Sequence, residues 1–185
     1  MISFDLTPEL KELQARARRF AQQEIAPIAA EYDRRGEHPG FVIERAYQEG
    51  LVNLAVPARY GGGGRGVLAN CVATEEMGAA CAGITTTIMV NSLATTPLVL
   101  FGSEEQNLAF LKPLCERHQL AAFCLTEHEA GSDASNVRTT AVRDGDSYVI
   151  NGLKCFISNG SLASLYTVFA LSDPERGARG MSALV

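Results

Sequence analysis

The sequence has no run of lysine or arginine residues, and its acidic side chains outnumber its basic ones. Sixteen Lys and Arg against 21 Asp and Glu give a formal net charge of -5 at pH 7. Nucleic acids and acidic membrane surfaces are bound mainly through clustered positive charge. No nucleic-acid partner is therefore expected, and a small molecule is the favoured partner.

Paired cysteines are also missing. The five cysteines stand in apolar surroundings, are odd in number and include no C-x-x-C pair: Cys71, Cys81, Cys115, Cys124 and Cys155. Such a set indicates reduced core residues. The first residues, MISFDLTPELKEL, carry acids early and no basic region followed by an apolar one, so no signal peptide is predicted. Together these features predict a cytoplasmic location.

A third absence is an uncharged apolar run of about 18 residues, the length that spans a bilayer. The segment that comes nearest, residues 79–101, is rich in Thr, Ser and Asn. No membrane span is therefore predicted.

Motifs of metal, hydrolase and nucleotide sites are absent or incomplete. His38, His118 and His128 are far apart and show no metal-ligand spacing, and no G-x-S-x-G elbow is present. GGGGRG at 61–66 fits G-x-G-x-x-G, but no acidic residue stands roughly 20 positions on and no Lys-Ser or Lys-Thr pair follows. We predict no metal site and interpret 61–66 as a flexible loop between helices.

What the first part of the chain does contain is helical periodicity. Thr7 before a proline is typical of a helix start, and apolar residues then recur every three or four positions, which predicts a long amphipathic helix kinked near Pro27. Further helices are predicted at residues 41–49, 67–81, 85–100 and 103–117. Ser103 with Gln106 has the reciprocal capping pattern that begins the last of these. Residues 1–119 are thus predicted to form an all-α domain.

After residue 120 the pattern changes to short segments rich in branched and aromatic residues, separated by turn signals. The predicted strands are 120–126, 137–142, 147–150, 153–158, 165–171 and 181–185. The predicted fold class is therefore α+β, with the helical domain followed by an incomplete antiparallel β-barrel or sheet domain at 120–185. Because the last strand would leave exposed edges, we interpret the chain as part of a longer protein or as one that needs a partner.

Two of the predicted strands end in polar groups. The first ends at Thr126 and is followed by Gly131 and Ser132, whose backbone N–H groups and hydroxyl are available to a ligand. The second carries Phe156 and ends at Ser158. An aromatic face with hydroxyl groups beside it suits a flat, hydrogen-bonding ring such as a flavin.

The first of these loops, CLTEHEAGSDASN at residues 124–136, also contains three carboxylates. Glu127, Glu129 and Asp133 are candidates for a general base. A carboxylate in a short exposed loop is more often a cap or a solvated group that titrates normally. Each is therefore predicted to be structural.

At these residues the chain resembles the acyl-CoA dehydrogenase family. CLTEHEAGSD is similar to the strand-loop signature of that family, and LKCFISNG is similar to its Lys-x-aromatic-Ile-Ser/Thr-Asn motif. AVPARYGGGG, TEEMGAAC, NSLATTPLVLFGSEEQ and FLKPLCERHQLAAF occur in the family's order and at its separations, so the resemblance covers essentially all 185 residues. His128 stands where proline is usual, Asn136 where a small residue is usual, and Phe156 where tryptophan is commonest.

The resemblance implies a bound FAD and an acyl-CoA substrate. The residues that it implies for the cofactor are Phe123, Leu125, Thr126, Gly131, Ser132, Phe156, Ile157 and Ser158. Those that it implies for the acyl-CoA are Ser132, Met89 and Leu93. By the same resemblance, Thr126 would meet the pyrimidine edge of the flavin, Phe156 would pack on its ring, and Ser158 would donate toward N5.

The implied reaction is the FAD-dependent α,β-dehydrogenation of an acyl-CoA thioester to a trans-2-enoyl-CoA, with the electrons passed to an electron-transferring flavoprotein. Family members are about twice this length, and their C-terminal helical domain supplies the catalytic glutamate and most of the subunit interface. No residue here matches that glutamate, so no catalytic residue is assigned and the isolated chain is predicted to be inactive. The full-length enzyme is expected to be a homo-oligomer.

Two alternatives are open. Acyl-CoA oxidases and flavin monooxygenases share this general architecture, and oxygen consumption by the reduced full-length enzyme would separate them from a dehydrogenase. A non-catalytic fragment that binds acyl-CoA or a protein partner is the third interpretation, and binding without flavin would favour it.

Overall fold

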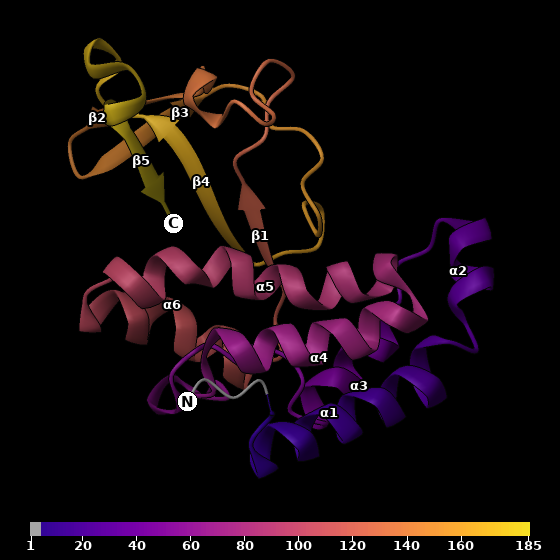
Figure 1. Cartoon of the computed structure of the whole chain (residues 1–185). Coiled ribbons are helices and arrows are strands. Elements are labelled where there is room, and N and C mark those ends of the chain that lie inside the picture. The colour runs from indigo at the N-terminus through magenta and orange to yellow at the C-terminus, as the bar shows by residue number, and fades with distance from the viewer. Residues whose placement is uncertain (1–4) are drawn as a thin grey trace.

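The structure is a computed structural model that describes residues 5–185. Residues 1–4, which begin the segment where no signal peptide is predicted, lie outside the described residues. Helices form one layer, and a small sheet lies against helix α5 (Ala82–Phe101), as Figure 1 shows. The predicted α+β fold class is thus confirmed, with a helical part followed by a sheet that does not close.

The helical layer follows the predicted helices closely, except at its first member. Its helices besides α5 are α1 (Pro8–Phe20), α2 (Ala29–Arg35), α3 (Gly40–Gln48), α4 (Gly66–Ala80) and α6 (Glu104–Glu116). Thr7 caps α1, and Ser103 and Gln106 form the predicted capping box of α6. The first helix is interrupted earlier than predicted: α1 ends at Phe20 and a π-helical turn, Ala21–Ile25, follows. Pro27 has no N–H for a helical hydrogen bond, so the chain begins a new helix after it.

Helix α5 is the central element of the fold. It packs against α4, α6 and the first strand of the sheet, and half of its residues are buried. Among residues 5–185 it is the one helix that is long and apolar enough to cross a membrane, with a mean hydropathy of 1.4. A buried core helix meets the same criterion, and α5 has this position here.

The sheet contains parallel as well as antiparallel pairs. Its strands are β1 (Ala121–Cys124), β2 (Thr140–Asp144), β3 (Ser147–Asn151), β4 (Leu165–Leu171) and β5 (Met181–Leu184). Their order is β1-β4-β2-β3, with β5 also paired to β4. The β2–β3 and β4–β5 pairs are antiparallel, but β1 and β2 both run parallel to β4. The prediction of an antiparallel sheet is therefore wrong for β1 and β4, because the long connection between them returns the chain in the same direction.

Side-chain hydrogen bonds fix the sheet on α5. The Asn91 amide donates to the Gln119 carbonyl at 3.0 Å, and its oxygen accepts from the Ala121 amide at 2.7 Å. The Thr167 hydroxyl, on β4, donates to the Ala94 carbonyl at 2.7 Å. All of these groups are buried or half-buried, so the bonds are shielded from water and orient the start of β1 on the helix.

The glycine-rich segment 61–66 connects helices and is tied by backbone hydrogen bonds to residues 53–56. The Gly63 amide donates to the Asn53 carbonyl at 3.1 Å, and the Gly64 amide donates to the Val56 carbonyl at 2.9 Å. A Cβ atom on Gly62 would lie 2.2 Å from the Val56 carbonyl oxygen. Glycine is required at 62 by this close approach of two backbone segments.

Candidate functional site

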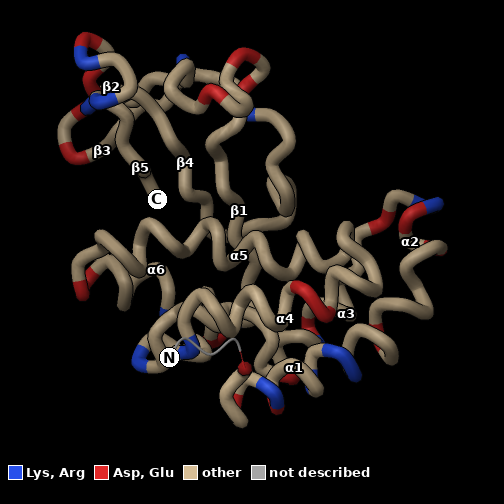
Figure 2. Tube along the Cα trace, viewed as in Figure 1, with Lys and Arg blue, Asp and Glu red and all other residues tan. Residues whose placement is uncertain are grey.

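A groove of about 510 Å³ lies between the helical layer and the sheet. Its helical wall comes from α4 and α5, and its other wall comes from β1 and two loops, residues 125–131 and 152–160. The lining residues are Thr74, Gly78, Ala82, Thr85, Thr86, Met89, Val90, Leu93, Phe123, Thr126, Phe156 and Ser158. None of them is charged, and Figure 2 shows that α5 carries no charged residue along its whole length.

The structure brings together six of the residues predicted from the sequence. Met89, Leu93, Phe123, Thr126, Phe156 and Ser158 all line the groove, although they come from three separate parts of the chain. Leu125, Gly131, Ser132 and Ile157 do not line it. Gly131, at the end of the 125–131 loop, and Ser132, directly after it, are exposed. Leu125 and Ile157 are half-buried. For all ten residues, a contact with a ligand stays a prediction.

Sequence reasoning missed five residues of the helical wall: Thr74, Gly78, Ala82, Thr85 and Thr86. Thr85 and Thr86 lie within one helical turn of Met89, so the three- and four-residue spacing of a helix face was the signal that could have found them. The Thr86 hydroxyl donates to the Ala82 carbonyl at 2.8 Å. The Thr85 hydroxyl is buried and has no hydrogen-bond partner among the described residues.

Residues 153–158 form a loop, so the predicted strand is wrong. Strand β3 ends at Asn151, and the chain then turns with positive φ angles of 56° at Phe156 and 60° at Asn159. The Asn159 amide donates to the Thr87 carbonyl on α5 at 2.9 Å, which ties the loop to the helical wall. A positive φ is uncommon for an aromatic residue and is found where surrounding contacts impose it.

Phe156 is the most exposed large apolar residue of the groove. It is 91% accessible to water although its neighbours in the groove are mostly apolar. An exposed aromatic side chain at a strained backbone position has an open face for stacking against a flat ring. Phe156 thus has an exposed ring face, and it lies on a loop rather than on the predicted strand.

Glu127 does not titrate normally, contrary to the prediction for the three loop carboxylates. Its side chain is buried, which by itself would raise its pKa. Hydrogen bonds from Lys154, from the Thr139 hydroxyl and from the amides of Arg138 and Thr139 outweigh burial and lower the pKa to about 2. Glu127 is therefore ionised at neutral pH and is held by donors, which suits a structural role rather than that of a base.

The other two loop carboxylates fit the structural interpretation. Asp133 accepts from the Ser135 amide at 3.2 Å, which caps a short helical turn at Ala134–Asn136. Glu129 is exposed and pairs with Arg138 at 2.5 Å. Neither residue lines the groove.

No histidine or cysteine lines the groove. His38 and His128 are exposed, whereas His118 is half-buried, stacks on Tyr47 and lies 2.8 Å from a Glu44 carboxylate oxygen. All five cysteines are free thiols. Within residues 5–185 no three His, Cys, Asp or Glu side chains are grouped so that they could hold a metal ion.

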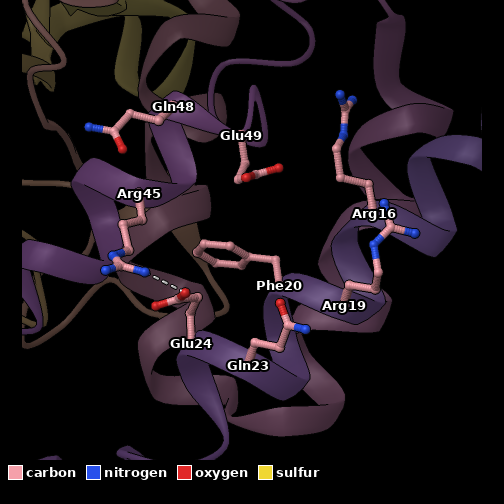
Figure 3. Close-up of a pocket in the computed structure, with 8 residues that line it drawn as sticks. All are labelled: Arg16, Arg19, Phe20, Gln23, Glu24, Arg45, Gln48 and Glu49. Atoms are coloured by element: carbon pink, nitrogen blue, oxygen red, sulfur yellow. Dashed lines mark hydrogen bonds and ion pairs between the residues drawn. The ribbon is translucent and has the colours of Figure 1, made fainter.

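A second cleft, of about 240 Å³, lies between α1, the π-helical turn and α3 (Figure 3). Its lining residues are Arg16, Arg19, Phe20, Gln23, Glu24, Arg45, Gln48 and Glu49. Three of these residues are arginines and two are glutamates, and Arg45 pairs with Glu24 at 2.6 Å. It contains no residue predicted to bind the cofactor or the acyl-CoA.

The class of protein follows from this geometry and from comparison with known families. A groove between a helical and a β part, largely apolar with a few hydroxyl groups, is typical of a site for a small molecule or cofactor. Residues 7–118 match the model of the acyl-CoA dehydrogenase N-terminal domain, and residues 122–185 match the model of its middle domain. The chain therefore belongs to the acyl-CoA dehydrogenase family.

Individual relatives agree with the family models. The chain is 41% identical to a probable acyl-CoA dehydrogenase, fadE25, of Mycobacterium leprae, over 98% of this chain and 47% of the relative. The solved structure of butyryl-CoA dehydrogenase from Megasphaera elsdenii superposes with a TM-score of 0.90 at 36% identity, covering 98% of this chain and 49% of that one. An acyl-CoA dehydrogenase complexed with FAD from Bacillus anthracis matches with a TM-score of 0.81 at 30% identity, over 92% and 30% of the two chains. The chain thus spans about half the length of the curated relative.

Proposed function

We propose that the groove binds the flavin ring of FAD and the acyl part of an acyl-CoA, and that the chain contributes this site to an acyl-CoA α,β-dehydrogenation. The observation that carries the proposal is the convergence of Met89, Leu93, Thr126, Phe156 and Ser158 on one groove. These residues come from a helix and two loops that are far apart in sequence. Family membership and the FAD complex of a relative support the same assignment.

The loop wall fits a flavin ring. Phe156 offers an open aromatic face, and the hydroxyl groups of Thr126 and Ser158 lie in the same groove, where they can hydrogen-bond to the edge of a flat heterocycle. Bound FAD would supply the two-electron acceptor for this reaction. The part of the protein is to hold and orient the ring.

The helical wall fits an acyl tail without a charged end. Met89 and Val90 are buried and Leu93 is half-exposed, so this wall is mostly apolar. No charged residue lines the groove, and a carboxylate at the end of a dicarboxylic acyl group would therefore lose its hydration without a cationic partner. We propose an acyl group without a terminal charge as the substrate class.

The groove contains no group that can take a proton from a thioester. Its polar residues are threonines and a serine, and no carboxylate or histidine lines it. Abstraction of an α-proton needs a positioned base with a suitable pKa. We therefore propose that the base comes from outside residues 5–185, that the chain alone is inactive, and that a homo-oligomeric full-length enzyme passes electrons to an electron-transferring flavoprotein.

The first experiment is the visible absorption spectrum of the 185-residue chain after incubation with FAD and removal of free cofactor. We expect a retained flavin band, because the groove presents both a stacking face and hydroxyl groups. If the chain is colourless after incubation with FAD at concentrations well above micromolar, this result would contradict the proposal that the groove suffices to hold the ring.

A turnover assay tests the second part of the proposal. The FAD-loaded chain is mixed with short, branched and long acyl-CoA thioesters and an artificial electron acceptor. We expect no reduction of the acceptor, because the groove has no base. Measurable reduction would show that a proton acceptor is present within this chain.

A further inference from the structure

One buried ion pair lies directly behind the loop wall of the groove. The Lys154 ammonium lies 2.7 Å from the Glu127 carboxylate and also donates to the Leu125 carbonyl at 3.0 Å. The two side chains are only 11% and 8% exposed. The neighbouring pair of Arg138 and Glu129 has side chains that are 68% and 55% exposed. Desolvation makes the buried pair of Lys154 and Glu127 costly to break, whereas the exposed pair of Arg138 and Glu129 is screened by water.

Glu127 joins three segments of the chain. Besides Lys154, its carboxylate accepts from the Arg138 amide at 2.7 Å, from the Thr139 amide at 3.0 Å and from the Thr139 hydroxyl. Its backbone also pairs with Ala130, which closes the 125–131 loop on itself. A single carboxylate thus connects the 125–131 loop, the start of β2 and the 152–160 loop.

The two loops that line the groove meet through few other bonds. The Cys155 amide donates to the Thr126 carbonyl at 3.0 Å, next to the two bonds of Lys154. Three successive residues, 125 to 127, are therefore bonded to either Lys154 or Cys155. No strand pairing joins these loops, so their spacing depends on these bonds.

The residues that line the groove are immediate neighbours of the ion pair in sequence. Thr126 directly precedes Glu127, and Phe156 and Ser158 follow Lys154 by two and four residues. Neither Glu127 nor Lys154 lines the groove. A change in the spacing of the pair would move the Thr126 hydroxyl relative to Phe156 and Ser158.

We propose that Glu127 and Lys154 are positioning residues that hold the two loops of the groove at the spacing required to bind the flavin ring. The identity of the ligand rests on the proposed function, but the loop spacing is a property of the chain without ligand. The pair acts through Thr126, Phe156 and Ser158 and touches neither cofactor nor substrate.

Hydrogen exchange of the FAD-free chain tests the structural part of the proposal. Peptides that cover 125–131 and 152–160 are compared in the wild type, Lys154→Met and Glu127→Gln. We expect exchange in both loops to accelerate at least tenfold in Lys154→Met and to a smaller extent in Glu127→Gln, whose amide oxygen can still accept from the backbone. Exchange in α4 and α5 should not change. Glu129→Gln, in the same loop but in the exposed pair, is the matched control and should behave as the wild type.

Titration with FAD tests the functional part. We expect the dissociation constant for FAD to rise at least tenfold in Lys154→Met, to stay within twofold of the wild type in Glu129→Gln, and to recover largely in Lys154→Arg, which keeps the positive charge. At saturating FAD, the flavin band of Lys154→Met should differ in shape from that of the wild type, because the ring would sit among displaced hydroxyl groups.

The outcomes separate the two proposals. Loops that exchange at the wild-type rate in both Lys154→Met and Glu127→Gln would overturn the positioning role, and so would a wild-type FAD affinity in Lys154→Met. If the wild-type chain binds no FAD, the proposed function fails, and the exchange experiment alone decides whether the pair sets the loop spacing. If Lys154→Met does not fold, the same comparison is made with Glu127→Gln and Lys154→Arg.

Discussion

The two walls of the groove reach their shape by different means. On the helical wall, Met89, Val90 and Leu93 are placed by the hydrogen bonds of α5, which is packed on several sides. On the loop wall, Thr126 and Phe156 lie in segments without regular hydrogen bonding to each other, and a buried ion pair behind them joins these segments. A residue that never touches the groove can therefore determine the shape of one wall but not of the other.

This difference has a consequence for mutations. On the helical wall, a substitution should affect stability through lost packing and leave the neighbouring groove residues in place. On the loop wall, a substitution at a distance should displace several groove residues together, because few bonds hold them. The four predictions below test this contrast in order of decreasing effect.

The largest effect is expected from Ile88→Ala on the buried side of α5. Ile88 is buried in the main hydrophobic core, and truncation of such a side chain removes apolar contacts and leaves a cavity. The free energy of unfolding, measured with urea, should fall by about 3 kcal/mol. Leu93→Ala, on the half-exposed side of the same helix, is the control and should cost less than about 1 kcal/mol. Equal losses in both variants would show that α5 is not the core helix.

Gly152→Ala should have the next largest effect on the free energy of unfolding, and this effect should arise in the loop wall. A Cβ atom at this position would lie 2.2 Å from the Thr139 hydroxyl oxygen and 2.8 Å from the Thr139 Cα, so the segment must move away. We expect a loss of about 2 kcal/mol in the free energy of unfolding. Gly131→Ala, on the other loop, would meet no atom within 4 Å and is the matched control. A stable Gly152→Ala with unchanged loop exchange would argue against the tight contact.

Acid should weaken the loop wall through Glu127. The pKa of Glu127 is about 2 in the folded chain against an ordinary value of 4.5, so its ionised form stabilises the fold above pH 4.5, and this stabilisation is lost as pH falls toward 2. Between pH 5 and pH 3 the loss should be on the order of 2 kcal/mol. Urea unfolding at both pH values should show a smaller pH dependence in Glu127→Gln than in the wild type. Glu129→Gln should keep the wild-type dependence, and an equal change in both variants would contradict the assignment to Glu127.

The smallest effect on stability, but a clear one on binding, is expected from Phe156→Ala. The ring is almost fully exposed, so its removal should change the free energy of unfolding by less than about 0.5 kcal/mol. If Phe156 stacks on the flavin, affinity for FAD should fall about tenfold, which corresponds to about 1.4 kcal/mol. Phe101→Ala removes another exposed ring outside the groove and should leave affinity unchanged. An FAD affinity that is the same in both variants would exclude stacking on Phe156.

Most of the fold could be predicted from the sequence because helices and their ends are encoded locally. The capping box of Ser103 and Gln106 and the end of α3 before Gly50 both depend on residues a few positions apart. The π-helical turn after Phe20 and the parallel pairing of β1 with β4 were not predicted. Both depend on packing and on partners distant in sequence, which no local pattern records.

The site was predictable in part for the same reason. Met89 and Leu93 stand on one face of a helix, and the family motifs mark Thr126 and Phe156, so these positions could be identified from the sequence. The loop conformation of residues 153–158 could not, because branched and aromatic residues suggested a strand while Lys154 and Asn159 are in fact bonded to other segments. Thr85 was missed although its spacing from Met89 is helical.

The sequence by itself determined the α+β order of the elements, the family and the residue types available for a flavin and an acyl group. Only the tertiary structure decided that Glu127 is buried and ionised, that Lys154 joins it behind the groove, and that Phe156 turns outward at a positive φ. The physical reason is the range of the forces involved. Periodicity and caps act between residues a few positions apart, whereas the state of a buried charge depends on donors that the fold brings from distant segments.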